Sequence, residues 1–103
     1  MNDIDVVALK AKMDAGEKFV FIDVRETWEY EAENLGALNI PLGELPGKVA
    51  ELREHEAEEI IIHCRSGARS GNAKLFLVKA GFKNVRNVLG GILDWNEKIV
   101  SKK

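Results

Sequence analysis

The sequence predicts an α/β fold in which a central parallel sheet of about five strands carries helices on both faces. Short apolar runs at 18–24 and 59–63 show no polar alternation, which is typical of strands covered on both sides. Between and after these runs, apolar residues recur at spacings of three and four, which is typical of amphipathic helices. Strands that alternate with helices in this way form parallel sheets wrapped by helices.

Length and composition predict one soluble domain over residues 1–103. The chain is 46% hydrophobic and 31% charged, with a net charge of −2. Disorder is disfavoured by this balance. No apolar run approaches the roughly 20 residues of a membrane span, so no membrane partner is expected. Nucleic-acid binding domains are normally basic, so no nucleic-acid partner is expected either.

The first helix is expected to begin after Asp3 or Asp5, because a short carboxylate side chain accepts hydrogen bonds from the free N–H groups of a first turn. Its end is expected at Gly16. The remaining elements of the first half are a strand within 18–24, a helix capped by Thr27 that runs through Asn34, a short strand at 38–40 and a helix from about 43 to 54.

The second half begins with a brief β-branched strand at 59–63, which is typical of a buried central strand. Residues 64–71 are polar and contain two glycines, so a loop is expected there. The later elements are a helix from about Arg69 to Ala80, a strand at 84–88, a break at Gly90 and Gly91, and a C-terminal helix marked by Ile92, Trp95 and Ile99.

Cys64 is the single cysteine of the chain, so no intrachain disulfide can form. One cysteine and two histidines outside any repeated pattern disfavour a structural zinc site. The first ten residues lack the basic and apolar regions of a secretory signal. A lone cysteine without a signal predicts a cytoplasmic location, where thiols stay reduced.

The position of Cys64 predicts a reactive thiol. Ligands of open α/β sheets bind just past the carboxyl ends of strands. The loop can aim backbone N–H groups inward, and the following helix N-terminus adds partial positive charge. Arg65 and Arg69 add full positive charges. Together these groups are expected to hold the pKa of Cys64 below its ordinary value and to favour the nucleophilic thiolate. The alternative is an inert, buried structural cysteine.

The loop length bears on the reaction class. Cysteine phosphatases separate their cysteine and arginine by five residues, to surround a tetrahedral phosphate. Here only four residues, Arg65 to Ala68, separate Cys64 from Arg69. The shorter ring favours a smaller target, such as a single terminal sulfur.

Four ordered motifs resemble the single-domain rhodaneses, a sulfurtransferase family. The segment 64–70 resembles the family's active-site loop, which the catalytic cysteine opens. The other matching segments are 21–26 with its continuation 28–30, 36–42, and 88–95. One departure is the sequence at 32–35, where the family often has Gly-His-Ile before the Gly-Ala step.

The resemblance implies a rhodanese-like fold and a double-displacement transfer of sulfane sulfur. Cys64 would take the outer sulfur of a donor such as thiosulfate and hold it as a persulfide. A thiophilic acceptor, either cyanide or a thiol, or a sulfur-carrier protein, would then remove it. No metal or organic cofactor is implied, and we expect a monomer. The expected substrate-binding residues are Arg65, Ser66, Gly67, Ala68, Arg69 and Ser70.

Two other functions stay open at this stage. One is a cysteine-dependent phosphatase or arsenate reductase, which the loop length disfavours. The other is a regulatory or protein-interaction module that keeps the fold but does not need Cys64.

Residues around this loop have structural interpretations. Asp23 and Arg25 are expected to form a structural ion pair, since buried charges are usually paired. His63 is expected to pack against the sheet, because neighbouring strand residues point to opposite faces. Trp28 and Trp95 are expected in core or rim packing. The two glycines Gly90–Gly91 are expected to provide either a close approach to Cys64 or a turn with positive φ.

Overall fold

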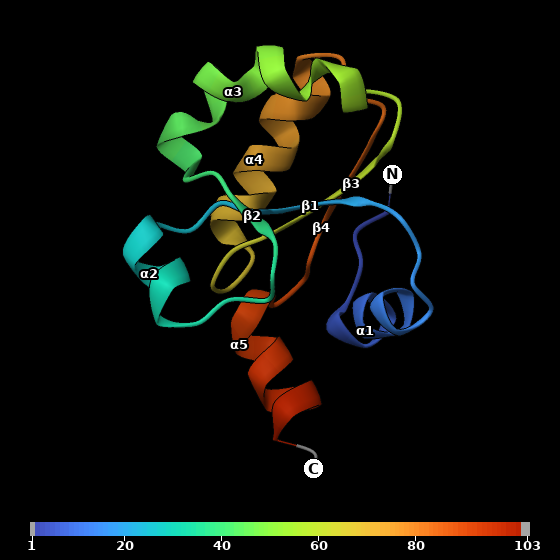
Figure 1. Ribbon diagram of the computed structural model, residues 1–103, viewed down its shortest axis with the longest axis vertical. Helices are drawn as coiled ribbons and strands as arrows, with labels where there is room; N and C mark the ends of the chain where they lie inside the picture. Colours follow the sequence, from blue (N-terminus) through green and yellow to red (C-terminus); the bar gives the residue numbers. More distant parts are fainter. Residues whose placement is uncertain (1, 102–103) are drawn as a thin grey trace.

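The sheet of the protein contains four parallel strands in the order β2–β1–β3–β4 (Figure 1), in a computed structural model that describes residues 2–101. An isolated parallel bridge joins Ile4 to Val88 at the outer edge of β4, where a fifth strand would lie. The predicted sheet of about five strands therefore consists of four strands and this bridge. The strands are β1 Val20–Asp23, β2 Leu38–Asn39, β3 Glu59–His63 and β4 Asn84–Asn87.

The helices follow the predicted order, with differences in their bounds. The second helix ends at Ala32 and not at Asn34, and the third begins at Leu45, two residues later than expected. The predicted cap of the first helix is confirmed, since the Asp5 side chain accepts a hydrogen bond from the Ala8 N–H at 2.8 Å. Thr27 is a helical residue, not the cap. The cap is Glu26, whose N–H donates to Glu29 Oε1 at 2.9 Å. The helix after Cys64 begins at Ala68 instead of Arg69. The helices are α1 Val6–Asp14, α2 Thr27–Ala32, α3 Leu45–Leu52, α4 Ala68–Lys79 and α5 Gly91–Trp95, with short helical turns η1 Leu42–Glu44, η2 Arg53–His55 and η3 Asn96–Val100.

Two apolar cores cover the two faces of the sheet. Helices α3 and α4 lie on one side of the sheet, and α1 and α5 lie on the other (Figure 1). Ile60 and Ile62 of β3 belong to the core under α3 and α4, and Ile61 belongs to the core under α1 and α5. All three side chains are fully buried. This placement explains why β3 is apolar without alternation, since both of its faces are covered.

The carboxyl ends of the strands bring distant residues to one edge of the sheet. Asp23 of β1 pairs in register with His63 of β3, and Ile62 pairs with Asn87 of β4. The residues that follow β1 and β3, and the end of β4, therefore meet at the edge where Cys64 lies. Among residues 2–101, no helix is both long and apolar enough to cross a membrane.

The two tryptophans differ in their surroundings. Trp95 is 9% exposed and belongs to the core under α1 and α5, as predicted. Trp28 is 72% exposed, so its predicted packing role is wrong. The physical reason is that α2 is a six-residue helix without a buried residue, which lies outside both cores.

Gly91 provides both the positive φ and the close approach to Cys64 that the sequence analysis gave as alternatives for Gly90 and Gly91. Its φ is +56°, and a Cβ at this position would lie 2.5 Å from the carbonyl oxygens of Cys64 and Arg65. The main chain after β4 can therefore approach the Cys64 loop only because residue 91 has no side chain.

We expect Gly91→Ala to lower the free energy of unfolding by about 2 kcal/mol or more, because a left-handed conformation alone costs roughly 1–2 kcal/mol and the clash adds to it. Urea unfolding measures this. Gly43→Ala is the matched control, since Gly43 has open space around its Cβ position and no positive φ. Equal stability changes in the two variants would contradict the close approach.

Candidate functional site

Cys64 follows the last residue of β3 and is 1% exposed. Its Sγ atom accepts hydrogen bonds from the Gly67 N–H at 3.1 Å and from the Ser70 N–H at 3.4 Å. The Ser70 hydroxyl lies 3.3 Å from the same sulfur. The sulfur thus lies between the loop that leaves β3 and the first turn of α4.

These contacts favour the ionised form of the thiol. Burial raises the pKa of Cys64, but hydrogen bonds from the Ser70 hydroxyl and from the N–H groups of Ser70, Gly67 and Ser66 lower it, and its net pKa lies below the ordinary value. The direction is the one expected from the sequence, and so is the part played by backbone N–H groups of the loop. The Ser70 hydroxyl was not singled out as a donor in the sequence analysis, and it supplies the largest lowering effect.

The carbonyl groups of the first two loop residues accept hydrogen bonds from another element. The Cys64 carbonyl accepts from the Ile92 N–H at 3.0 Å, and the Arg65 carbonyl accepts from the Leu93 N–H at 3.1 Å. Both donors belong to the first turn of α5. Because each peptide plane has its carbonyl on one side and its N–H on the other, these contacts help to leave the N–H groups facing Sγ.

Asn87 is a further residue of the site, and the sequence analysis did not select it. Its Nδ2 donates to the Gly67 carbonyl at 3.1 Å, and its Oδ1 accepts from the Ser70 hydroxyl. Asn87 thereby contacts Gly67 and Ser70, two of the residues that donate to Sγ. Its own N–H donates to Asp3 Oδ1 at 3.0 Å. A sequence signal existed, because a polar residue near the end of a predicted parallel strand lies at the same sheet edge as Cys64.

The Ser70 hydroxyl faces two acceptors but carries one hydrogen. When Cys64 is protonated, its S–H can donate to Ser70 Oγ while Ser70 donates to Asn87. When Cys64 is ionised, the Ser70 hydrogen can turn to the sulfur. The Ser70 hydroxyl can therefore form a hydrogen bond with Cys64 in either protonation state, as acceptor from the thiol or as donor to the thiolate.

The two arginines of the loop have different surroundings. Arg69 forms a two-point ion pair with Glu29 of α2, with nitrogen–oxygen distances of 2.7 and 3.0 Å. Arg65 is exposed, and no carboxylate pairs with it within residues 2–101. Arg65 is therefore the unpaired cation of the loop, while Arg69 ties α4 to α2.

The other predicted binding residues divide by what they contact. Gly67 and Ser70 donate to the sulfur, and the Ser66 N–H lowers the pKa of Cys64. Ala68 has an exposed side chain and begins α4. In the described part of the chain, no hydrogen bond joins Ala68 to Sγ.

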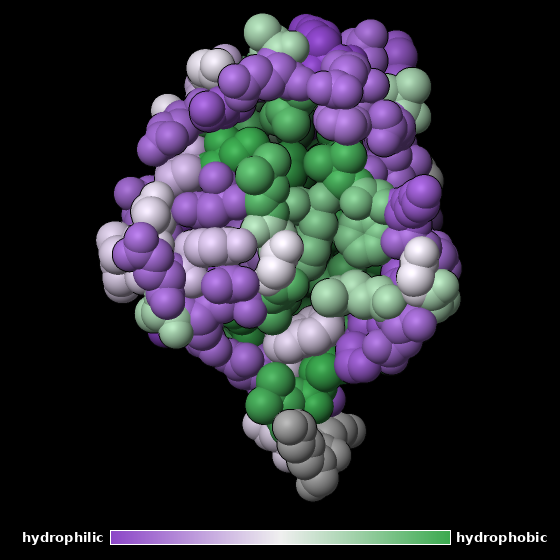
Figure 2. All heavy atoms as spheres, in the orientation of Figure 1, coloured by the Kyte–Doolittle hydropathy of each residue, from purple (hydrophilic) through white to green (hydrophobic). Residues whose placement is uncertain are grey.

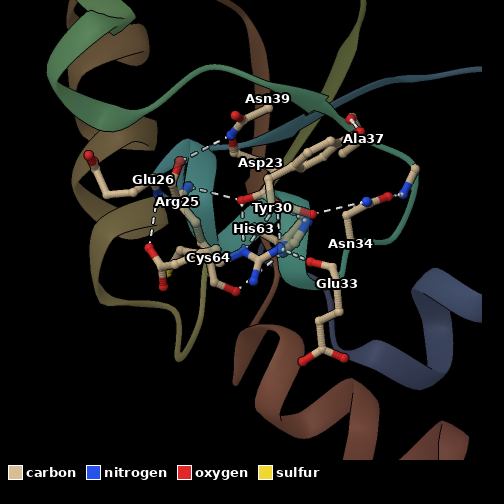
Figure 3. Close-up of polar contacts among 12 residues, drawn as sticks. Asp23, Arg25, Glu26, Tyr30, Glu33, Asn34, Ala37, Asn39, His63 and Cys64 are labelled. Carbon is tan, nitrogen blue, oxygen red and sulfur yellow. Dashed lines mark hydrogen bonds and ion pairs between the residues drawn. The ribbon is translucent and has the colours of Figure 1, made fainter.

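Asp23 and Arg25 form the predicted buried ion pair. The Arg25 Nη2 lies 2.8 Å from Asp23 Oδ2 and also donates to the Glu33 carbonyl at 2.7 Å. Figure 3 shows this guanidinium reaching from the end of β1 to the end of α2. Asn39 adds hydrogen bonds to the carbonyls of Asp23 and Arg25. The pair therefore fixes α2 against the sheet edge beside Cys64.

His63 packs under the sheet, as predicted, on the face opposite to Cys64. It is fully buried, and its ring lies 5.3 Å from that of Phe21. Burial lowers the pKa of His63 below its ordinary value, which favours the neutral imidazole. Its Nδ1 lies 3.2 Å from the carbonyl oxygen of Cys64, not from the sulfur. This geometry does not form a Cys–His dyad.

A family model described as the rhodanese-like domain matches residues 5–98 of this chain. The chain therefore belongs to the rhodanese-like domain family. YtwF of Bacillus subtilis, provisionally named a sulfurtransferase, is 40% identical over 97 residues, which cover 92% of this chain and 90% of YtwF.

Another relative from Bacillus subtilis, YrkF, is provisionally named a sulfur carrier protein. It is 43% identical over 97 residues, which cover 93% of this chain and 51% of YrkF, so this chain spans about half the length of that relative. The solved structure of the human single-domain sulfurtransferase TSTD1 superposes with a TM-score of 0.77 at 28% identity and covers 93% of this chain and 96% of that chain. These relatives support sulfur transfer as the general class of activity.

We expect Ser70→Ala to slow alkylation of Cys64 by iodoacetamide at pH 7 about tenfold, because a hydrogen bond to a charged group contributes roughly 1.5 kcal/mol and its loss raises the pKa of the thiol. Alkylation rates between pH 5 and 10 measure the change. Ser66→Ala is the matched control, since the Ser66 contribution comes from its main chain. An unchanged rate profile in Ser70→Ala would contradict the role of the hydroxyl.

Glu29 provides a second test, of the link between α2 and α4. The hydrogen bonds from Arg69 lower the pKa of Glu29 from 4.5 to about 2. A carboxylate with a lowered pKa in the folded state stabilises the fold fully above its unfolded pKa, and this stabilisation is lost as the pH falls toward the folded pKa. We therefore expect the stability advantage of the wild type over Glu29→Gln to be constant from pH 7 to about 5 and to shrink from pH 4.5 toward 2.

Urea unfolding at a series of pH values measures this difference. Glu31→Gln, on an exposed position of the same helix, is the control and should show no such pH dependence. A difference between wild type and Glu29→Gln that stays constant down to pH 2.5 would contradict the ion pair.

Proposed function

We propose that this protein is a sulfurtransferase that carries sulfane sulfur as a persulfide on Cys64, with thiosulfate as a competent donor. The observation that supports this most strongly is the set of donors around Sγ, in which Gly67 and Ser70 supply hydrogen bonds at 3.1 to 3.4 Å. A sulfur atom placed in this way is favoured as a thiolate, and the thiolate is the nucleophile.

The reaction proceeds in two displacements. In the first, the Cys64 thiolate attacks the outer sulfur of the donor, the sulfur–sulfur bond of the donor breaks, and sulfite leaves with the bonding electron pair. Cys64 then carries a persulfide anion. In the second, cyanide or a thiolate attacks the terminal sulfur, and Cys64 leaves as a thiolate. Covalent capture divides one transfer into two easier steps.

The residues of the loop take different parts in this proposal. Main-chain N–H groups from Ser66 to Ser70 stabilise the persulfide anion. Arg65 provides the unpaired positive charge for an anionic donor. Arg69 contributes through the ion pair with Glu29, which holds α2 beside the loop. The four-residue separation of Cys64 and Arg69 supports one terminal sulfur over a phosphate as the occupant.

We expect incubation with thiosulfate to raise the intact mass by about 32 Da, the mass of one sulfur atom, and cyanide to remove the gain with release of thiocyanate. Intact-protein mass spectrometry measures both steps. Cys64→Ser should not gain mass, and Ser66→Ala should load normally.

A wild-type protein that stays unmodified, or a Cys64→Ser variant that still gains sulfur, would refute the proposal. Cys64-dependent hydrolysis of an aryl phosphate would favour the phosphatase hypothesis instead. Full cellular function of Cys64→Ser would favour the interaction module.

A further inference from the structure

An exposed aromatic side chain lies beside the Cys64 loop. Trp28 projects from α2 with 72% of its surface exposed, although the other tryptophan of the chain is buried. With Ala32, Ile92 and Leu93 it lines a groove of about 510 Å³. Arg65, the neighbour of Cys64, lines the same groove. A molecule that covers Trp28 in this groove therefore also lies against Arg65, the residue next to Cys64 in the sequence. Exposed tryptophans of this kind are enriched among residues that dominate binding to proteins.

The charges around Trp28 indicate which partner fits. Glu26, Glu31 and Glu33 are exposed on or next to α2, and none of them forms an ion pair within the described residues 2–101. Of these three carboxylates, Glu33 lines the groove. Arg69 is paired with Glu29, which leaves Arg65 as the groove arginine without a carboxylate partner among residues 2–101. The segment from Glu26 to Glu33, which carries Trp28, therefore presents three unpaired carboxylates against one unpaired arginine, although the sequence of the loop alone pointed to a cationic site.

We propose that this groove docks a positively charged protein that presents a cysteine thiol as the sulfur acceptor. The inference rests on the proposed function and names its partner class. Basic side chains of the partner would pair with the carboxylates of α2, an apolar side chain would cover Trp28, and the thiol would reach the loop. Charges of opposite sign across an interface steer the encounter and reject partners of like charge.

The transfer step is balanced without any further reactant. The partner's cysteine loses its proton to solvent and attacks the terminal sulfur of the Cys64 persulfide. The bond between that sulfur and Sγ breaks, and the bonding pair stays on Cys64 as a thiolate. The partner's cysteine becomes the persulfide, so the sulfane sulfur changes carrier without net oxidation.

Three peptides of equal length test the charge preference. Each carries one cysteine, flanked by four lysines, four serines or four glutamates. The protein is first loaded with thiosulfate, and transfer to each peptide is followed by mass spectrometry. Each rate is divided by that peptide's rate with a small disulfide reagent, because flanking charges change the reactivity of the thiol itself. We expect the lysine peptide to exceed the glutamate peptide about tenfold at low ionic strength, and the ratio to fall toward one at 0.5 M salt.

Two variants test whether the preference for the lysine peptide comes from Trp28 and the carboxylates of α2. Trp28→Ala and Glu31→Lys should each slow transfer to the lysine peptide about three- to tenfold while the rate of transfer to cyanide changes less than twofold. Glu54→Lys, at an exposed position in η2, is the matched charge control and should leave both rates unchanged.

Equal normalised rates for the three peptides, or a Trp28→Ala variant that transfers to the lysine peptide as fast as the wild type, would overturn the docking surface. In either case transfer to cyanide would still support the proposed function. A protein that gives sulfur to neither cyanide nor any peptide would overturn both.

Discussion

The site depends on how the main chain is oriented around one sulfur atom. Cys64 is buried, and burial by itself would keep its thiol protonated. Donors from the Gly67 peptide and from Ser70 outweigh this effect. They can do so because other elements take the carbonyl groups of the same loop. The first turn of α5 binds the carbonyls of Cys64 and Arg65.

The fold supplies each of these supports from a different part of the chain. The absence of a side chain at Gly91 lets α5 approach the loop, and Asn87 at the end of β4 contacts both Gly67 and Ser70. The Asp23–Arg25 pair and the Arg69–Glu29 pair hold α2 over the same edge. Parallel strands explain why these groups converge, since their carboxyl ends share one edge of the sheet. Figure 2 shows that, on one face of the molecule, an apolar region is surrounded by polar side chains.

The features with local causes could be predicted from the sequence. The bounds of β3 follow from its β-branched run, the start of α1 follows from the Asp5 carboxylate, and the pair of Asp23 and Arg25 follows from two opposite charges at the end of a buried strand. The rhodanese-like fold and the general class of activity were also predictable, because four motifs occur in order along the chain. Features that depend on contacts distant in sequence could not be predicted. The pairing of Arg69 with Glu29 joins residues 40 positions apart, and no spacing rule signals it.

Trp28 shows a second reason why part of the structure could not be predicted from the sequence. An aromatic residue in a helix is normally expected to pack inward, but whether a six-residue helix reaches a core depends on where the chain carries it. Its exposure became visible only with the placement of α2. For Asn87, the sequence predicted the position near the end of a strand. It did not predict the hydrogen bonds of Asn87 with Gly67 and Ser70, which are distant in sequence.

Titration of the Cys64 thiolate by its absorbance at 240 nm, at low salt and at 1 M salt, tests the central claim most directly. If hydrogen bonds in a buried site stabilise the thiolate, its midpoint lies below the ordinary thiol pKa of about 8.5 and changes little with salt. A midpoint at or above the ordinary value would contradict the account. A low midpoint that rises strongly with salt would contradict it as well, because exposed charges and not the loop's hydrogen bonds would then be the cause.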